Sequence, residues 1–279
     1  MELIDNIADM KAFSESHRSQ GNTISFVPTM GALHEGHLQL VKNARNLSDI
    51  LVVSIFVNPT QFGPNEDFDK YPRDLDKDKN LLEELGVDAI FFPSADNMYP
   101  GGFQTTVEVQ EIQKPLCGKF RPGHFGGVVT VVLKLFNIVK PHYAVFGEKD
   151  YQQLCVIRQM VSDLNVDVEV LSHPIVREES GLAMSSRNEY LKSDKRQQAA
   201  SISDALFNVK KQFDSGVNDK KNLLDTAYSI LNEADIREIE YLEIVDGQNL
   251  SEKKAVSSGD VVAVAARLDG TRLIDNIRL

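Results

Sequence analysis

Residues 28–37 read Pro28-Thr29-Met30-Gly31-Ala32-Leu33-His34-Glu35-Gly36-His37, and they set the framework for the rest of the chain. An apolar run before them, Thr23–Val27, predicts a strand, and an apolar-periodic segment after them, Leu38–Leu47, predicts a helix. Two histidines three residues apart therefore stand where a strand passes into a helix N-terminus. In an α/β fold phosphates bind at this place, because free N–H groups and the positive end of the helix dipole point outward there.

The residue types in this stretch suit phosphate chemistry. Gly31 permits a tight turn, and Gly36 lets a ligand approach the backbone. His34 and His37 can donate hydrogen bonds to triphosphate oxygens whose charge grows in the transition state. Two alternatives stay open: a pair of surface histidines in a polar loop, and a metal site. The metal reading is weaker, since His-Glu-Gly-His is one residue short of the zinc-protease pattern and no Cys or further His stands nearby in sequence.

Strand-like runs alternate with helical patterns through the first part of the chain. The predicted strands are Ile24–Val27, Ile50–Val57, Ala89–Phe92, Ala144–Phe146 and Val166–Leu171. The predicted helices are Leu38–Leu47, Leu75–Leu85, Val128–Val139 and Tyr151–Leu164. This alternation predicts a parallel sheet with helices on both faces. Ligands bind beyond the carboxyl ends of such strands, so the residues after Val27, Val57 and Phe146 are the candidates for a site.

The pattern changes in the polar stretch Pro174–Ser193. Two helical segments follow, about Asp194–Phe213 and Lys221–Ala234, and then three strand-like runs, Glu238–Val245, Val261–Arg267 and Arg272–Ile277. Helices followed by strands are typical of a separate small α+β domain. The sequence therefore predicts two domains, residues 1–175 and residues 176–279.

Composition limits the class of protein. A chain of 279 residues with 42% hydrophobic residues is that of a soluble globular protein with about two domains. A net charge of −11 argues against nucleic acid as a partner. No apolar run approaches the ~20 residues that cross a bilayer, and Met1–Lys11 resembles neither a signal nor a transit peptide. Cys117 and Cys155 form no close-spaced motif, so a reducing cytoplasm is expected.

Polar residues also follow the next predicted strand and precede a later helix. Asn58 and Gln61 can recognise a hydroxyl or a carboxylate without using charge, although taken alone they are better explained as turn residues. Arg121, in Lys119–Gly127, matches phosphate oxygens with its planar fork. An exposed Arg in a glycine-rich connection explains that segment equally well.

Two later segments repeat the logic of the first. Gly147-Glu148-Lys149-Asp150 follows a predicted strand and precedes a helix with Gln152 and Gln153. Lys149 can hold a phosphate, and Asp150 can accept from ribose hydroxyls, cap the helix, or do both. Met184-Ser185-Ser186-Arg187-Asn188 offers hydroxyls and a guanidinium to a phosphate, although such triplets are common in exposed loops.

Together these motifs resemble the His-x-Gly-His adenylyl-transferring Rossmann superfamily, which includes the class I aminoacyl-tRNA synthetases. Longer strings are similar to the pantoate–β-alanine ligase family over nearly the whole chain: PTMGALHEGH, VNPTQFGPNEDFDKYPR, GKFRPGHFGGV, FGEKDYQQ, GLAMSSRN, YLEIVD and GTRLIDN. The resemblance implies an α/β fold with a Rossmann-like doubly wound parallel sheet and a second, smaller α+β domain.

The resemblance also implies a two-step reaction in pantothenate biosynthesis. Pantoate attacks the α-phosphorus of ATP to give pantoyl adenylate and pyrophosphate, and β-alanine then displaces AMP. Mg²⁺ would accompany ATP, with its protein ligands unknown and no tightly bound organic cofactor. The family is dimeric, so a cytoplasmic homodimer is implied, without nucleic acid or membrane as a partner.

The family's functional residues map onto this chain. His37, His34 and Lys149 would be catalytic. ATP would bind through Met30, Gly31, His34, His37, Gly147, Glu148, Lys149, Asp150, Val176, Met184, Ser185, Ser186 and Arg187. Pantoate and β-alanine would meet Gln61, Gln153, Asn58 and Arg121.

Three rival functions stay open at this point. A superfamily member that makes a dinucleotide or nucleotide-coenzyme product would need a basic pocket in place of Gln61 and Gln153. A tRNA-binding synthetase fragment or regulator would need a basic, aromatic C-terminal region, and this chain is acidic. A catalytically silent nucleotide sensor would carry the same motifs.

Overall fold

The computed structural model describes residues 1–64 and 66–279; Asn65, within one of the motifs above, lies outside the described residues. Contacts within the chain group the described residues into two compact units. The first unit comprises Met1–Gln110, Arg121–Glu148 and Val156–Pro174, and the second comprises Glu111–Phe120, Lys149–Cys155 and Ile175–Leu279. The second unit thus includes two short segments from before residue 175, and the division into domains 1–175 and 176–279 stays a prediction.

The first unit is built on a six-stranded parallel sheet with the strand order β1-β4-β3-β2-β5-β6. Its strands are β1 (Glu2–Ile4), β2 (Ile24–Thr29), β3 (Ile50–Ile55), β4 (Ala89–Phe91), β5 (Tyr143–Gly147) and β6 (Glu169–His173). The chain winds outward from β2 to β3 and β4 in one direction, and from β5 to β6 in the other. The carboxyl ends of the neighbours β2 and β5 therefore form the switch point where such sheets bind ligands.

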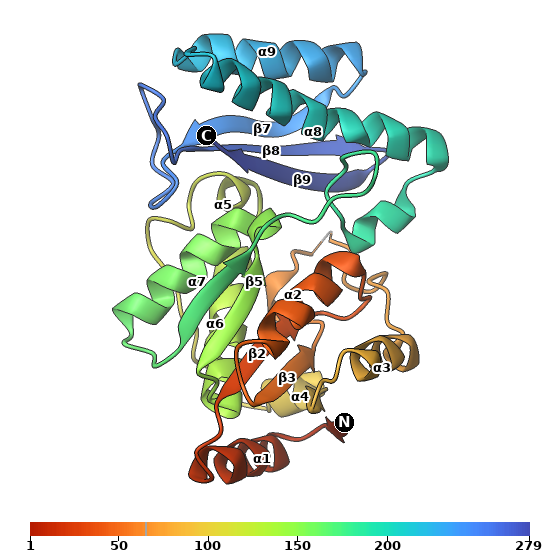
Figure 1. Ribbon diagram of the computed structural model, residues 1–279, viewed down its shortest axis with the longest axis vertical. Coiled ribbons are helices and arrows are strands. Elements are labelled where there is room, and N and C mark those ends of the chain that lie inside the picture. The colour runs from red at the N-terminus through yellow and green to blue at the C-terminus, as the bar shows by residue number, and fades with distance from the viewer. Residues whose placement is uncertain (65) are drawn as a thin grey trace. The chain divides into compact units, whose positions relative to one another are not determined.

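Helices cover both faces of this sheet (Figure 1). They are α1 (Ile7–Ser19), α2 (Glu35–Arg45), α3 (Leu75–Glu84), α6 (His124–Val139) and, from Val156 onward, α7 (Tyr151–Asp163), with a short α4 (Ala95–Met98). Val27 and Val145 pack in one core with α2 and α3, while Phe26 and Phe146 meet Phe136 of α6 at ring distances of 6.4 Å. Successive strand residues thus face opposite layers, and the prediction of an α/β fold is confirmed.

The ends of several elements differ from the predicted ones for local reasons. The helix predicted from Leu38 begins at Glu35, because His34 has extended backbone and serves as its N-cap. The helix predicted from Val128 begins at His124, so glycines assigned to a loop lie in a helix. The strand predicted from Val166 begins at Glu169, because Asn165 is left-handed (φ 52°) and the Val166 N–H closes the end of α7 on the Val161 carbonyl.

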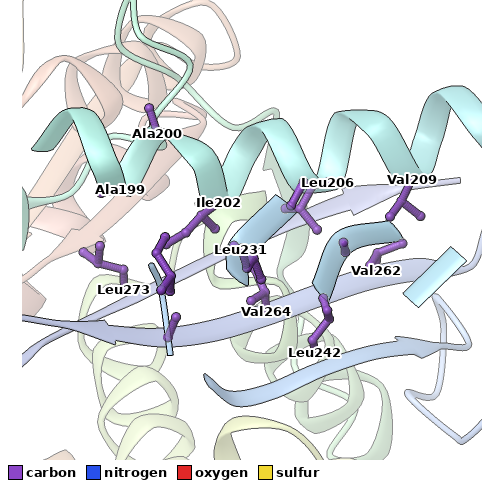
Figure 2. Packing of buried hydrophobic residues seen from close by; sticks show 14 of the residues in the cluster. Ala199, Ala200, Ile202, Leu206, Val209, Leu231, Leu242, Val262, Val264 and Leu273 are labelled. Atoms are coloured by element: carbon purple, nitrogen blue, oxygen red, sulfur yellow. The ribbon is translucent and has the colours of Figure 1, made fainter. Parts of the chain in front are cut away.

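The second unit contains a three-stranded antiparallel sheet with two helices packed on one face. The strands β7 (Glu238–Val245), β8 (Val261–Leu268) and β9 (Thr271–Arg278) are adjacent in that order, beside α8 (Ser193–Asp214) and α9 (Lys220–Glu233). Figure 2 shows Ile202, Leu206 and Val209 of α8 directed at Val262 and Val264 of β8. These elements match the predicted small α+β part of the chain.

Gln152 explains why two earlier segments belong to the second unit. Its side-chain amide donates to the carbonyls of Ile112 (3.1 Å) and Pro115 (2.7 Å) and accepts from the Cys117 N–H (2.9 Å), where α5 (Cys117–Phe120) begins. Cys117 Sγ in turn lies 3.0 Å from the hydroxyl of Tyr241 on β7. Burial raises the pKa of Tyr241 well above its ordinary value, and the neighbouring thiol adds to this.

None of the described helices combines the length and apolar character needed to cross a bilayer.

Candidate active site

The turn after β2 is held by a carboxylate from α3. Gly31 (φ 80°) and Ala32 (φ 50°) are both left-handed, and Asp78 accepts the N–H groups of Ala32 (2.9 Å) and Leu33 (2.8 Å). A Cβ on Gly31 would lie 2.9 Å from Asp78 Oδ2, so glycine is required there. The N–H groups of Ala32 and Leu33, which precede the helix, are therefore not open to an external anion, because the Asp78 carboxylate accepts both. Burial raises the pKa of Asp78, against the lowering effect of these two hydrogen bonds.

His34 and His37 lie together at the N-terminus of α2. Their ring centroids are 4.1 Å apart and the rings are tilted by 36°. The N–H of His34 donates to His37 Nδ1 at 3.4 Å, so the neutral His37 ring carries its proton on Nε2, the form that donates a hydrogen bond from that atom. The pair is well placed to meet an anion at the positive end of a helix.

The turn after β3 brings Gln61 next to Met30. This turn is the 3-10 segment η1 (Pro59–Gln61), and Gln61 Nε2 lies 3.2 Å from Met30 Sδ. Asn58, which is buried, donates to Gln61 Oε1 (3.1 Å) and to the Gly127 carbonyl (3.1 Å), while its own oxygen accepts from Tyr99. The structure therefore brings together three predicted site residues, with Asn58 as the support of Gln61.

A close approach of η1 to α6 explains the helical glycine. A Cβ on Gly127 would lie 2.4 Å from the Thr60 carbonyl oxygen and 2.8 Å from Gln61 Cα. No larger residue fits without moving η1. The glycine-rich sequence before the predicted helix thus marks a place where one backbone packs directly on another.

Arg121 is engaged within the first unit. Its Nε and Nη2 donate to the Glu66 carboxylate at 2.7 and 2.6 Å, and its Nη1 lies 2.9 Å from His124 Nε2. His124 Nδ1 lies 2.8 Å from the Gln61 carbonyl oxygen, so the three side chains form a chain of contacts that ends on Gln61. Burial acts to raise the pKa of Glu66, but the hydrogen bonds and charge of Arg121 outweigh it and lower that pKa to about 2.

The end of β5 lies against α2. A Cβ on Gly147 would lie 3.9 Å from Leu40 Cδ1, and Glu148 accepts a hydrogen bond from Ser172 of the neighbouring β6 at 2.8 Å. Gly147 and Glu148 are therefore placed on the same switch point as the two histidines, within the first unit.

The remaining predicted residues belong to the second unit. There the main-chain oxygen of Lys149 accepts a hydrogen bond from Asn276 of β9 at 2.9 Å, and its Nζ lies 3.9 Å from Asp150 Oδ2. Gln153 lies in the first turn of α7, next to the structural Gln152. The position of Lys149 is thus fixed by a residue more than a hundred positions later.

Residues 176–184 fold back on themselves. The Met184 N–H donates to the Val176 carbonyl at 2.9 Å, which brings these two predicted nucleotide ligands together. Arg177 binds both oxygens of Asp275 (2.6 and 3.0 Å) and the Gly181 carbonyl (3.1 Å). Burial raises the pKa of Asp275, and the Arg177 guanidinium opposes that effect.

The serine segment continues from this fold-back as a defined turn. Ser185 accepts the Arg187 N–H at 3.3 Å and begins the 3-10 segment η3 (Ser186–Tyr190). Asn188 is buried and donates to Glu178 (2.8 Å) and to the Ala183 carbonyl (3.1 Å). The two hydroxyls and the guanidinium are thus carried on a braced turn within the second unit.

Sequence reasoning missed the residues that support this machinery: Asp78, Glu66, His124, Asp275 and Asn276. One of them left a signal. Asp78 stands with Leu75 and Leu82 on the apolar stripe of α3, where a carboxylate needs buried partners. Among the described residues there is no group of three or more His, Cys, Asp or Glu side chains that could hold a metal ion.

Comparisons with known proteins agree with this architecture. The family model "Pantoate-beta-alanine ligase" matches residues 2–278. A pantothenate synthetase of Sulfurihydrogenibium sp. is 54% identical over 278 residues, which cover 99% of both chains.

Two solved structures are similar over the whole chain. That of pantoate-beta-alanine (pantothenate synthetase) from Thermus thermophilus is 44% identical with a TM-score of 0.95, and it covers 100% of this chain and 99% of its own. A pantoate-beta-alanine ligase from Francisella tularensis, complexed with beta-gamma ATP and beta-alanine, is 38% identical with a TM-score of 0.81 and covers 100% and 97%. Because the family model and these relatives span nearly the full length of the chain, the protein belongs to the pantoate–β-alanine ligase family.

Proposed function

We propose that this ligase condenses pantoate with β-alanine at the expense of ATP, as a step of pantothenate biosynthesis. The pantoate carboxylate attacks the α-phosphorus of ATP, which gives pantoyl adenylate and releases pyrophosphate. The amine of β-alanine then attacks the acyl carbon and displaces AMP. The observation that carries the proposal is the His34–His37 pair at the N-terminus of α2, beyond the carboxyl end of a central parallel strand.

The first step needs anions to be positioned and charge to be neutralised at phosphorus. In the proposal His34 and His37 contact the phosphates, and His37 donates from Nε2 to an oxygen that gains charge as pyrophosphate leaves. No covalent nucleophile of the protein is required, since the substrate carboxylate attacks directly. In the proposal Lys149 binds a phosphate group and neutralises part of its negative charge.

Neutral amides suit a hydroxy acid. Gln61 and Gln153 hold pantoate in the proposal, and Gln61 also approaches β-alanine. Asn58 holds the side chain of Gln61. Arg121 holds its main chain, both directly (3.4 Å to the Gln61 carbonyl) and through His124. If Asn58 or Arg121 contacts substrate directly, as predicted, it must give up some of these internal hydrogen bonds.

The proposal includes further contacts with ATP. Val176 would meet adenine through its backbone, and Asp150 the ribose. The full proposed set adds Met30, Gly31, Gly147, Glu148, Met184, Ser185, Ser186 and Arg187. An acyl adenylate must be shielded from water, so a segment that closes over the phosphates during turnover is part of the proposal.

Magnesium enters the proposal as part of the substrate. Mg²⁺ keeps several waters and binds through substrate phosphates with one or two carboxylates, so it needs no all-protein cage. A cytoplasmic homodimer of two-domain subunits completes the proposal.

An isotope experiment tests the bond order. Pantoate labelled with ¹⁸O in its carboxylate should deliver one labelled oxygen to AMP, because the bridging oxygen stays with phosphorus when the amine displaces it. Pantoate should also be required for exchange of labelled pyrophosphate into ATP. Label recovered in inorganic phosphate would contradict the adenylate route and indicate an acyl-phosphate ligase.

A further inference from the structure

The turn that carries the two histidines contains an anion site filled from within. The N–H groups of Ala32 and Leu33 converge on the Asp78 carboxylate at 2.9 and 2.8 Å, each on its own oxygen. Consecutive N–H groups arranged in this way usually bind a phosphate or another anion. Here the anion is supplied by α3, from a residue 45 positions beyond Leu33.

This arrangement fixes a backbone that is unfavourable by itself. Ala32 is a non-glycine residue with φ 50°, directly after Gly31 at φ 80°. Left-handed backbone persists at a non-glycine residue where its surroundings hold it. The N–H groups on either side also donate within the turn: that of Gly31 to Thr29 Oγ1 (3.1 Å) and that of His34 to His37 Nδ1 (3.4 Å). Asp78 therefore holds the backbone of the two residues that directly precede His34.

The carboxylate is tightly enclosed. Asp78 is 1% exposed, and a methyl group on Gly31 would come within 2.9 Å of its Oδ2 and 3.0 Å of Ile55. Asp78 Oδ2 therefore occupies the space that a side chain at position 31 would need. The backbone of the turn is thus held by a buried side chain of one length and one set of acceptors.

We propose that Asp78 is a positioning residue for the adenylation step: it occupies the anion site of the 31–33 turn, so that the triphosphate is met by the His34 and His37 rings and not by the main chain. This inference rests on the proposed function. Loss of Asp78 should displace His34 relative to His37, and an error of about 1 Å in such a group can cost about 10²-fold in rate. The second step, amine attack on the acyl carbon, does not need the triphosphate contacts and should be spared.

The test compares Asp78→Asn with Asp76→Asn. Asn keeps the shape of Asp78 but presents an NH₂ group to one of the two N–H groups, whereas Asp76 is exposed in the same helical turn and serves as the control for charge. Pantoate-dependent pyrophosphate exchange should fall about 10- to 100-fold in Asp78→Asn and stay within about twofold in Asp76→Asn. Pantothenate formation from supplied pantoyl adenylate and β-alanine should stay within about twofold in both.

Two further measurements keep the outcome clear. The Hε1 proton resonances of His34 and His37 are assigned with variants that each lack one of these histidines. They should shift in Asp78→Asn and not in Asp76→Asn, and this readout does not depend on activity. Should Asp78→Asn not fold, Asp78→Glu, which keeps the charge but moves it by one methylene, is measured for the same split between the two steps. Equal loss of both steps, or wild-type exchange with unshifted histidines, would overturn the inference. Shifted histidines together with a wild-type enzyme that exchanges no pyrophosphate would instead contradict the proposed function alone.

Discussion

Two strand-to-helix turns of this chain, those after β2 and β5, look alike in sequence and are held in different ways. Both consist of a strand, a glycine, charged or imidazole side chains and a helix start. The turn after β2 is braced by a charged side chain of its own unit, Asp78. Lys149, in the turn after β5, is held through its main chain by the neutral amide of Asn276. A local pattern therefore sets the kind of turn, while a residue distant in sequence sets its orientation, and that residue differs from turn to turn.

The largest expected effect comes from removing one of the two histidines that follow β2. His37→Ala should lower the rate of pantoate-dependent pyrophosphate exchange by about 10²–10³-fold, the usual cost of one preorganised donor to a developing charge. His17→Ala, on α1, is the matched control and should leave exchange unchanged. Circular dichroism should show both variants folded. Exchange near the wild-type rate in His37→Ala would remove the histidine pair from the mechanism.

A smaller effect is expected from the support of the second turn. Asn276→Ala leaves the Lys149 carbonyl without its 2.9 Å donor and displaces the backbone that carries the lysine. An error of about 1 Å in the place of a reacting group can cost about 10²-fold in rate, so we expect a partial displacement of Lys149 to lower exchange about tenfold. Asn208→Ala, which removes an amide bonded to the Asp204 carbonyl on the exposed side of α8, is the control. If both variants exchange like the wild type, the second turn does not depend on Asn276.

The smallest effect concerns pH and separates ionic from neutral supports. Glu66, in the contact chain that ends on Gln61, has a pKa of about 2 against an ordinary value of 4.5. A carboxyl whose pKa is lowered by folding adds stability above its unfolded pKa, and this stability is lost as pH falls from about 4.5 toward about 2. The wild type should therefore be more stable than Glu66→Gln at pH 7, by a few degrees of melting temperature. In a chain of this size, each kcal/mol of unfolding free energy corresponds to about 2–4 °C.

The measurement is the melting temperature of both proteins between pH 7 and pH 2. The gap between them should close across the window from about pH 4.5 to about pH 2, since the protonated wild-type side chain then resembles Gln. A gap that stays constant over this range would show that the ion pair with Arg121 does not stabilise the fold. Asn276→Ala provides the contrast, because its amide does not titrate and its gap to the wild type should not close in this window.

Much of the architecture could be predicted because it depends on local periodicity. The runs at β2, β3 and β8 and the apolar stripes of α8 and α9 appear where the patterns place them. Two elements at the N-terminus, β1 and α1, were not predicted, since three residues of an edge strand and a weakly patterned helix give little signal. The predicted start of β6 is three residues too early for a local reason as well. Asn165 is left-handed and extends the end of the preceding helix by a closing turn.

By itself, the sequence determined the alternation of strands and helices, the small α+β part that follows, and the family motifs that carry the proposed phosphate-binding groups. These features follow from apolar spacing and from the chemistry of single side chains, which neighbours in the chain do not change. Tertiary structure alone decided which partners hold those groups: Asp78 on the first turn, the Glu66–Arg121–His124 chain on Gln61, and Asn276 on Lys149. Such partners lie tens to more than a hundred residues apart in sequence. Their pairing depends on strand order and on buried polar groups having to find one another, and neither is written in a local pattern.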